Sequence, residues 1–250
     1  MQKYILYSAN FIKKINFAPQ FLKTMAQEKD EVLVDVQEVY SKTERYIEEN
    51  KRSLAVIVIG IVVIIAGYFA WDKLYIGPKE LDAQKEMFMA EKYFEKDSID
   101  KAINGDGNFK GFKYIIDEYG FTKAENLAHY YLGICYLKKG EYQNAIDQLN
   151  EFECDDQVVG PIAVGAIGDA NMELGKAEEA ISYYLKAAKL RENKFTTPIY
   201  LMKAGLAYED QKNYTNAVKI YEQLKSDYAE TAEGREVDKY LARAKALAGA

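Results

Sequence analysis

The sequence predicts an all-α protein in which a solenoid of paired helices follows one N-terminal transmembrane helix. The evidence for the solenoid is a pattern of small and aromatic residues that occurs three times in the second half of the chain. Its period of about 35 residues is typical of helix–turn–helix units that stack to bury their apolar faces. The evidence for the membrane helix is an apolar stretch at residues 54–71. The composition agrees, because 21 Tyr and only 4 Pro suit helices that pack through aromatic and small side chains.

The charge of the chain argues against nucleic acid as a partner. The sequence has 33 Lys and Arg against 39 Asp and Glu, a net charge of −6. Nucleic-acid phosphates are bound by clustered Lys and Arg, and the sequence contains no basic stripe. We therefore expect proteins and a membrane as partners, and no nucleic acid.

The first 24 residues differ in composition from the residues after them. They contain four lysines and no acid, and polar residues interrupt any apolar run of signal-peptide length. At Met25 the composition changes to MAQEKDEVLVDV. Residues 1–24 are therefore interpreted either as an upstream misread start or as an amphipathic targeting arm.

Residues 25–53 are predicted to form a cytoplasmic amphipathic segment. Apolar, aromatic or β-branched residues recur there at helical spacing, opposite a charged face. They are Val32, Val36, Val39, Tyr40, Thr43 and Ile47. The segment is either a solvated helix that continues into the membrane span or a dedicated docking helix.

Residues 54–71 (LAVIVIGIVVIIAGYFAW) are predicted to span a membrane, since no charge occurs between Arg52 and Asp72. Eighteen helical residues extend roughly 27 Å, close to the thickness of the hydrocarbon core. Tyr68, Trp71 and Tyr75 gather at the C-terminal end, where aromatic rings anchor at headgroup level. The alternative is a buried helix of a soluble protein.

The basic residues on either side of this stretch predict its orientation. Four precede it within a short distance and three follow it, so the positive-inside rule favours a cytoplasmic N-terminus. The four are Lys42, Arg45, Lys51 and Arg52, and the three are Lys73, Lys79 and Lys85. We therefore expect a single-pass protein of the inner (plasma) membrane whose repeats lie in the periplasm.

The repeated pattern identifies tetratricopeptide repeats (TPRs). Gly133, Gly168 and Gly205 mark the position at which the two helices of a unit cross closely, and Ala145, Ala180 and Ala217 are expected opposite them. This pattern defines repeats at residues 126–159, 161–194 and 198–231, and the first helix of the first repeat is expected from Asn126 to Lys139. Residues 78–125 fit a degenerate first repeat with a loop inserted in its second helix, and residues 232–250 a closing helix that covers the last apolar face.

Over residues 25–250 the chain resembles the YfgM-like family of single-pass TPR proteins. The segments that carry the resemblance are NGDGNFKGFKYIIDEYG (residues 104–120) and TKAENLAHYYLGICYLKKGEYQNAI (residues 122–146), which look like the form found in Bacteroidetes. The resemblance implies a periplasmic repeat domain that accompanies the Sec translocon. It also implies translocon components, a periplasmic chaperone or emerging polypeptides as partners.

Catalytic, metal and cofactor sites are not expected. Asn104, Asp106 and Asn108 alternate as in a calcium loop, but Phe109 replaces the glycine and Ile115 the closing acid that such a loop requires. The single histidine, His129, has no nucleophile at a recognisable spacing and is expected to be a packed repeat residue. Cys135 and Cys154 are expected to be separate thiols, with Cys135 buried, because the predicted helix geometry holds them too far apart for a disulfide.

The first helices of the repeats are expected to line a concave protein-binding groove with an apolar floor and an acidic rim. The predicted floor residues are Leu127, Tyr130, Ile134, Leu137, Ile162, Met172, Ile199, Met202 and Leu206. Asp169, Glu173, Glu209 and Asp210 are assigned to the rim. The groove is either open to a partner or filled by the closing helix or the degenerate first repeat.

These features together predict a membrane-anchored TPR scaffold rather than an enzyme. The scaffold would bind proteins on the extracytoplasmic side, in a chaperone-like role or as an ancillary part of the Sec translocon. One alternative is an adaptor of another envelope assembly. The other is an enzyme or regulator whose active residues the repeat pattern conceals.

Overall fold

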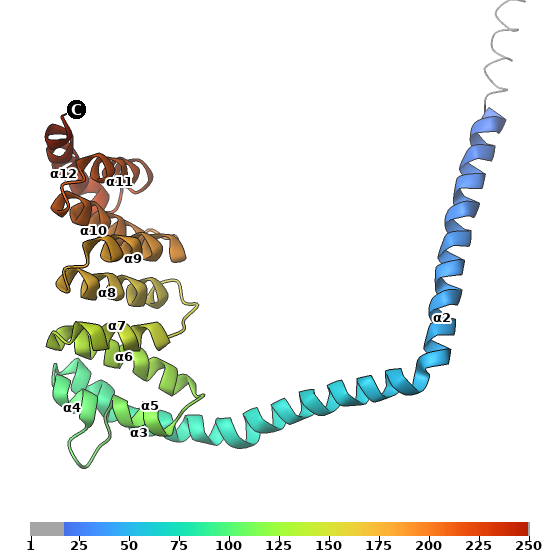
Figure 1. Ribbon diagram of the computed structural model, residues 1–250, viewed down its shortest axis with the longest axis horizontal. Coiled ribbons are helices and arrows are strands. Elements are labelled where there is room, and N and C mark those ends of the chain that lie inside the picture. Colours follow the sequence, from blue (N-terminus) through green and yellow to red (C-terminus); the bar gives the residue numbers. More distant parts are fainter. Residues whose placement is uncertain (1–17, 250) are drawn as a thin grey trace, which may run out of the picture. The chain divides into compact units, whose positions relative to one another are not determined.

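The computed structural model describes the backbone of residues 18–249 and the side chains of residues 44–249 (Figure 1). Every regular element in that range is a helix, and it contains no strand. The chain divides into two compact units, Met1–Ala70 and Trp71–Ala250, which are considered separately. Residues 1–17 of the expected N-terminal arm lie outside this description, and so do the side chains of Val32, Val36, Val39, Tyr40 and Thr43.

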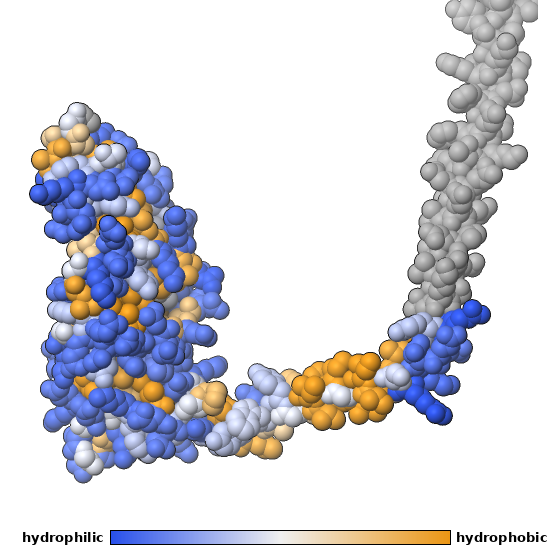
Figure 2. All heavy atoms as spheres, in the orientation of Figure 1, coloured by the Kyte–Doolittle hydropathy of each residue, from blue (hydrophilic) through white to orange (hydrophobic). Residues whose placement is uncertain are grey.

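The first unit contains a single long helix, α2 (Ala18–Trp71). Its apolar stretch is largely exposed, and Figure 2 shows it as a band of hydrophobic surface. The exposed fraction reaches 72% at Ile64, and none of the apolar window is buried. The helix is long and apolar enough to cross a membrane.

The second unit is a stack of helices that begins with a π-helical turn. Its elements are η1 (Asp72–Ile76), α3 (Gly77–Glu95), α4 (Ile99–Asn104), α5 (Phe112–Glu118), α6 (Lys123–Lys139), α7 (Tyr142–Glu151), α8 (Val159–Glu173), α9 (Ala177–Leu190), α10 (Thr196–Asp210), α11 (Tyr214–Asp227) and α12 (Ala232–Ala248). Helices α6 to α11 form three successive pairs, each with a first helix (A) and a second helix (B), and α12 lies at the C-terminal end (Figure 1). The fold is therefore an all-α TPR-type solenoid.

Small residues allow the two helices of each pair to pack closely. A Cβ atom added to Gly133 would lie 2.6 Å from Leu149 Cγ and 3.3 Å from the Ala145 carbonyl oxygen. At Gly168 the corresponding neighbours are the Tyr184 ring at 2.6 Å and the Ala180 carbonyl oxygen at 3.3 Å. At 2.6 Å the facing side chain would have to shift to admit a Cβ atom, and 3.3 Å is already a tight contact. The glycines and alanines therefore mark the close helix crossings, as the repeat pattern predicts.

The first helix of the first of these pairs is longer than expected. Helix α6 begins at Lys123 rather than Asn126, because Thr122 caps it: its hydroxyl oxygen accepts a hydrogen bond from the Glu125 N–H at 3.0 Å. Glu80 of α3 accepts further bonds from the N–H groups of Lys123 and Ala124. Two segments 43 residues apart thus meet at this helix terminus.

The residues before α6 form a helix pair whose second member is divided. Helix α3 packs on α4 and α6, and a loop separates α4 from α5. The Asp106 carboxylate holds the loop by accepting bonds from the N–H groups of Asn108 and Phe109, and the Tyr93 hydroxyl donates to it at 2.6 Å. Asp106 therefore serves to close this loop.

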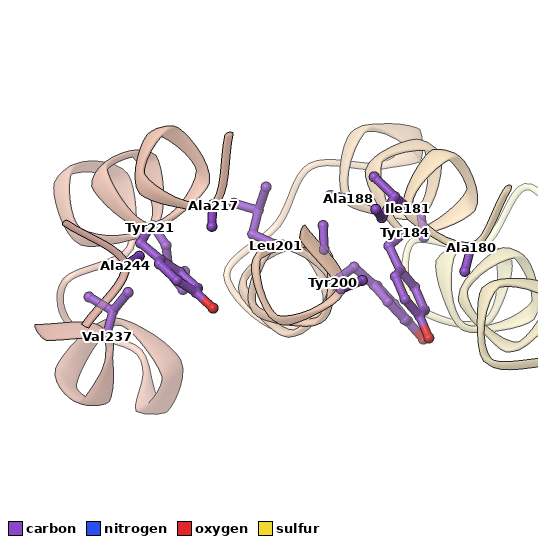
Figure 3. Close-up of a cluster of buried hydrophobic side chains, with 14 of the residues drawn as sticks. Ala180, Ile181, Tyr184, Ala188, Tyr200, Leu201, Ala217, Tyr221, Val237 and Ala244 are labelled. Carbon is purple, nitrogen blue, oxygen red and sulfur yellow. The ribbon is translucent and has the colours of Figure 1, made fainter. Parts of the chain in front are cut away.

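Helix α12 adds to the core of the last pair. Val237, Leu241 and Ala244 are buried in one cluster with Tyr221 and Leu224 of α11 (Figure 3). Helix α12 thus shares its buried apolar side chains with α11 and packs on that helix.

Candidate functional site

A hollow of about 330 Å³ opens between the second and third pairs of helices in the stack, counting the α3–α4 pair as the first. It is lined by residues of α6, α7, α8 and α9, namely Leu137, Tyr142, Asp169, Met172, Glu173 and Tyr184. Leu137 and Met172 are two of the nine residues predicted for the groove floor, and Asp169 and Glu173 were assigned to its rim. Tyr142 and Tyr184 were not predicted. Apolar and acidic groups thus converge on one concave site.

The charge of Asp169 is compensated within the site. Lys203 of α10 reaches back to it, and the Lys203 Nζ atom lies 2.6 and 2.7 Å from the two carboxylate oxygens. The Tyr184 hydroxyl donates to Asp169 Oδ1 at 2.8 Å. Burial raises the pKa of Tyr184, and the neighbouring Asp169 charge raises it further. The hydroxyl therefore stays protonated and keeps Asp169 in place.

Glu173 has no cationic partner among the side chains of residues 44–249. The Tyr142 hydroxyl donates to Glu173 Oε2 at 3.2 Å, and this hydrogen bond raises the pKa of Tyr142. Glu173 is itself exposed to solvent. The hollow therefore offers one uncompensated carboxylate beside the apolar side chains of Leu137 and Met172.

The other predicted floor residues are not gathered into this hollow. Eight of the nine are half-buried, and Leu206 is 39% exposed. Tyr130, Ile134 and Leu137 pack against the buried cluster between α7 and α8, whereas Met172 and Met202 pack against the larger C-terminal cluster. Leu127 contacts the N-terminal cluster, and Ile162 and Ile199 are partly exposed on α8 and α10. Of the nine predicted floor residues, only Leu137 and Met172 line the hollow.

A second polar group resembles the one around Asp169. The Tyr221 hydroxyl donates to Glu209 Oε1 at 2.9 Å, and Arg243 Nε donates to Glu209 Oε2 at 2.8 Å. In both groups the cation follows the acid by 34 residues in the sequence. Lys203 lies on α10 and Arg243 on α12, and each contacts an acid on an earlier helix. Figure 3 shows the hydroxyls of Tyr184, Tyr200 and Tyr221 pointing to one side of the packed helices. The 34-residue spacing from acid to cation can be read from the sequence and could have predicted both ion pairs. The pattern of small and aromatic residues does not include it.

The groups considered for chemistry have structural partners instead. The His129 ring nitrogens lie 2.9 Å from Gln148 Oε1 and 3.0 Å from Glu125 Oε1, and the ring is buried. Cys135 is buried and Cys154 is partly exposed, and both are free thiols. Burial raises the pKa of Cys135 to about 12, which keeps it protonated and unreactive.

Comparison with known families identifies the repeats. Three models described as tetratricopeptide repeat match residues 115–158, 163–194 and 200–231. The chain carries tetratricopeptide repeats. TPR folds are typically scaffolds that bind other proteins without catalysing a reaction, so the repeats indicate a protein-binding scaffold.

Individual proteins that are similar to this chain also contain TPR or TPR-like repeats. Tetratricopeptide repeat protein 29 of Macaca fascicularis is 29% identical over 109 residues, which cover 40% of this chain and 23% of that protein. Two crystal structures of nearly identical TPR-like repeats from a Podosopora anserina putative kinesin light chain, one of them a point variant, each align with a TM-score of 0.51. They cover 69% of this chain and 88% of theirs at 15% and 14% identity, which supports the fold alone.

Proposed function

We propose that this TPR protein is a membrane-anchored scaffold that holds a partner protein at the membrane surface. The observation that carries the proposal is the hollow lined by Leu137, Met172 and Glu173, because it combines half-buried apolar side chains with one uncompensated carboxylate. A partner segment with an apolar side chain next to a lysine or arginine fits this combination. The apolar side chain would be removed from water, and the cation would pair with Glu173.

The anchor in this proposal is the exposed apolar stretch of α2, with the N-terminus in the cytoplasm and the repeats in the periplasm. The exposure of that stretch and the excess of basic residues before it support this arrangement. Tethering confines the repeats to the membrane surface and so raises their concentration near other membrane components. Contacts that are weak in solution would then be sufficient to hold the partner protein.

The identity of the partner in this proposal comes from the resemblance to YfgM-like proteins. That resemblance favours components of the Sec translocon, a periplasmic chaperone or an emerging polypeptide. The role is binding alone, since the described His and Cys residues have structural surroundings.

A crosslinking experiment tests the hollow as the contact site. A photoreactive amino acid would replace Met172 in the full chain, expressed in its own cells, and the crosslinked proteins would be identified. The same experiment with Glu173→Lys should reduce the yield of the main crosslink about tenfold, because a lysine repels the basic side chain of the partner.

Glu192→Lys provides the matched control. Glu192 is exposed beyond the C-terminal end of α9, outside the hollow. The substitution makes the same change of charge and should leave the crosslink yield unchanged. Equal yields with both variants, at equal helicity, would contradict the proposed role of Glu173.

A further inference from the structure

The junction between α7 and α8 lacks the ion pairs that join the other neighbouring helix pairs of the stack. Lys138 with Asp97 and Lys139 with Asp100 connect α6 to the α3–α4 pair. Further ion pairs connect α8 to α10 and α10 to α12. Among the side chains of residues 44–249, no ion pair joins α6 or α7 to α8 or α9. This junction therefore depends mainly on apolar packing and on the chain connection itself.

The apolar packing at this junction is also limited. Six buried residues of α7 and α8 form the cluster there, fewer than half as many as in either neighbouring cluster. Three of the six are alanines, namely Ala163, Ala166 and Ala170. Stabilisation by burial is proportional to the apolar area removed from water, so this cluster contributes less than the two beside it. The stack thus consists of an N-terminal block (α3–α7) and a C-terminal block (α8–α12) that are joined by a smaller core.

The connection between α7 and α8 is bound to a different block at each of its ends. At the first end, the Glu153 N–H donates to Asn126 Oδ1 of α6 at 2.9 Å, and Asn126 Nδ2 donates to the Glu153 carbonyl oxygen at 2.8 Å. At the second end, Arg191, which follows α9, donates to Asp155 Oδ1 at 2.8 Å. Glu153 is therefore held by the N-terminal block and Asp155 by the C-terminal block.

Cys154 alone separates these two sets of contacts. The residues after it are held by a further bond of the C-terminal block, from Asn193 Nδ2 to the Gln157 carbonyl oxygen at 3.0 Å. Cys154 itself forms no backbone–backbone hydrogen bond with any described residue. A hinge consists of a few loop residues that absorb the change of φ and ψ when two rigid parts move. Cys154 occupies the position of such a hinge.

The hinge and the hollow lie at opposite ends of α8. Figure 1 shows the α7–α8 connection on one side of the stack and the turns after α6 and α8 on the other. Cys154 precedes Val159, the first residue of α8, whereas Glu173 is the last residue and lines the hollow. The two ends of α8 are about 20 Å apart, so a rotation of about 10° at the hinge displaces Glu173 by about 3 Å. The displacement is relative to Leu137 and Tyr142, which line the hollow from the N-terminal block.

One hydrogen bond spans the hollow from block to block. The Tyr142 hydroxyl donates to Glu173 Oε2 at 3.2 Å. We propose that the stack bends at Cys154, that the Tyr142–Glu173 hydrogen bond holds the hollow closed, and that bending opens the hollow to the side chain of a partner. A cation of the partner that pairs with Glu173 replaces the Tyr142 hydrogen bond, so binding favours the open arrangement. This coupling to a partner rests on the function proposed above, whereas the hinge does not.

Distances between spin labels test the hinge in the full chain, purified in detergent micelles. Gln143, Glu178 and Thr215 are the exposed second residues of α7, α9 and α11. Labels on Gln143→Cys and Glu178→Cys span the hinge, and labels on Glu178→Cys and Thr215→Cys form the matched control pair within the C-terminal block. Cys154→Ser removes the partly exposed thiol, and the buried Cys135 stays unlabelled. Electron paramagnetic resonance should give a distance distribution about twice as wide for the first pair as for the second.

Tyr142→Phe tests the closing hydrogen bond, because it removes the hydroxyl and retains the ring. It should raise the open population of the Gln143–Glu178 pair about two- to fivefold, as expected for the loss of one solvent-accessible hydrogen bond. Tyr214→Phe is the control, since Tyr214 is the first residue of α11, as Tyr142 is of α7, and lies outside the hollow. It should leave the distances of both label pairs unchanged.

The outcomes separate the hinge from the proposed function. Equal widths for the two label pairs would overturn the hinge, and unchanged distances in Tyr142→Phe would overturn the closing role of the hydrogen bond. Photocrosslinking at Met172 tests the coupling: Tyr142→Phe should raise the yield about twofold or more at equal helicity, and an unchanged yield would overturn it. The distance measurements need no partner, so failure of the Glu173→Lys experiment would contradict the proposed function and leave the hinge in place.

Discussion

The residue that follows each A helix determines how the chain turns into the B helix. The turn residue lies one or two positions after the last helical residue and is Asp97, Gly140, Gly175 or Lys212, with φ between 55° and 77°. In each turn two N–H groups donate to carbonyls of the last helical turn, as in Gly140 N to Leu137 O at 3.1 Å and Glu141 N to Tyr136 O at 2.9 Å. This is the Schellman arrangement, which favours glycine because the left-handed conformation crowds a Cβ atom.

The first prediction concerns Lys212, which adopts this conformation without being glycine. Its side chain is exposed and its φ is 56°, so Lys212→Gly removes strain and no buried contact. The substitution should raise the free energy of unfolding of residues 71–250 by about 1 kcal/mol. Urea unfolding followed by circular dichroism measures the change.

Gly140→Ala is the reverse experiment and should lower the same free energy by a similar amount, because it introduces a Cβ atom at φ of 77°. Equal stability of Lys212→Gly and the parent chain would mean that the turn is not in the left-handed conformation in solution.

At the scale of the helices, stability depends on how closely the two members of a pair approach. Ala180 is completely buried, and its carbonyl oxygen would lie 3.3 Å from a Cβ atom on Gly168. The α10–α11 pair packs as closely, since a Cβ atom on Gly205 would lie 2.3 Å from the Tyr221 ring. The small residues were identifiable in the sequence because close packing leaves no alternative to them at each crossing.

The second prediction tests this closeness. Ala180→Leu inserts three heavy atoms between α8 and α9, and it should lower the free energy of unfolding of residues 71–250 by about 1 to 3 kcal/mol. The effect should extend to α10, because α9 also packs on that helix. Hydrogen exchange of the α10 amides, together with the melting temperature, measures both effects.

Ala242→Leu is the control, since Ala242 is exposed on α12. It should change the stability by less than about 0.5 kcal/mol. If both leucine variants had the same melting temperature as the parent chain, Ala180 would not lie at a close helix crossing.

At the scale of the whole repeat unit, the sequence predicts the helices better than the site. The period and the small residues identify the helix pairs because each pair must satisfy the same packing. The hollow depends instead on how α6 and α8 of successive pairs are placed. Tyr142 and Tyr184 line it because of the packing between neighbouring pairs, which the pattern within one repeat does not specify. Phe121 illustrates the same limit. Its ring is exposed in the connection before α6, and the sequence Gly-Phe-Thr does not indicate that exposure.

The buried tyrosines give the repeat unit a common dependence on pH. Tyr184, Tyr200 and Tyr221 lie in the C-terminal core cluster, and burial raises the pKa of each above its ordinary value of about 10. The Glu209 carboxylate, which accepts a hydrogen bond from Tyr221, raises the pKa of that residue further. The folded state therefore retains protons that the unfolded chain releases in alkali.

The last prediction is alkaline unfolding of residues 71–250. A raised pKa contributes stability that is fully present below the unfolded pKa and is lost as pH rises toward the folded value. The free energy of unfolding should therefore fall from about pH 10 upward, by about 1.4 kcal/mol per pH unit for each tyrosine that stays protonated only in the fold. Absorbance at the tyrosinate band and circular dichroism should change together in a single step.

Tyr200→Phe should shift that step to higher pH, because it removes one of the three groups whose ionisation opposes folding. Tyr75→Phe, at an exposed position of η1, should leave the step where it is. Ionisation of all tyrosines near pH 10 with unchanged helicity would show that the three rings are accessible to water, and would contradict the packing that places them between the helices.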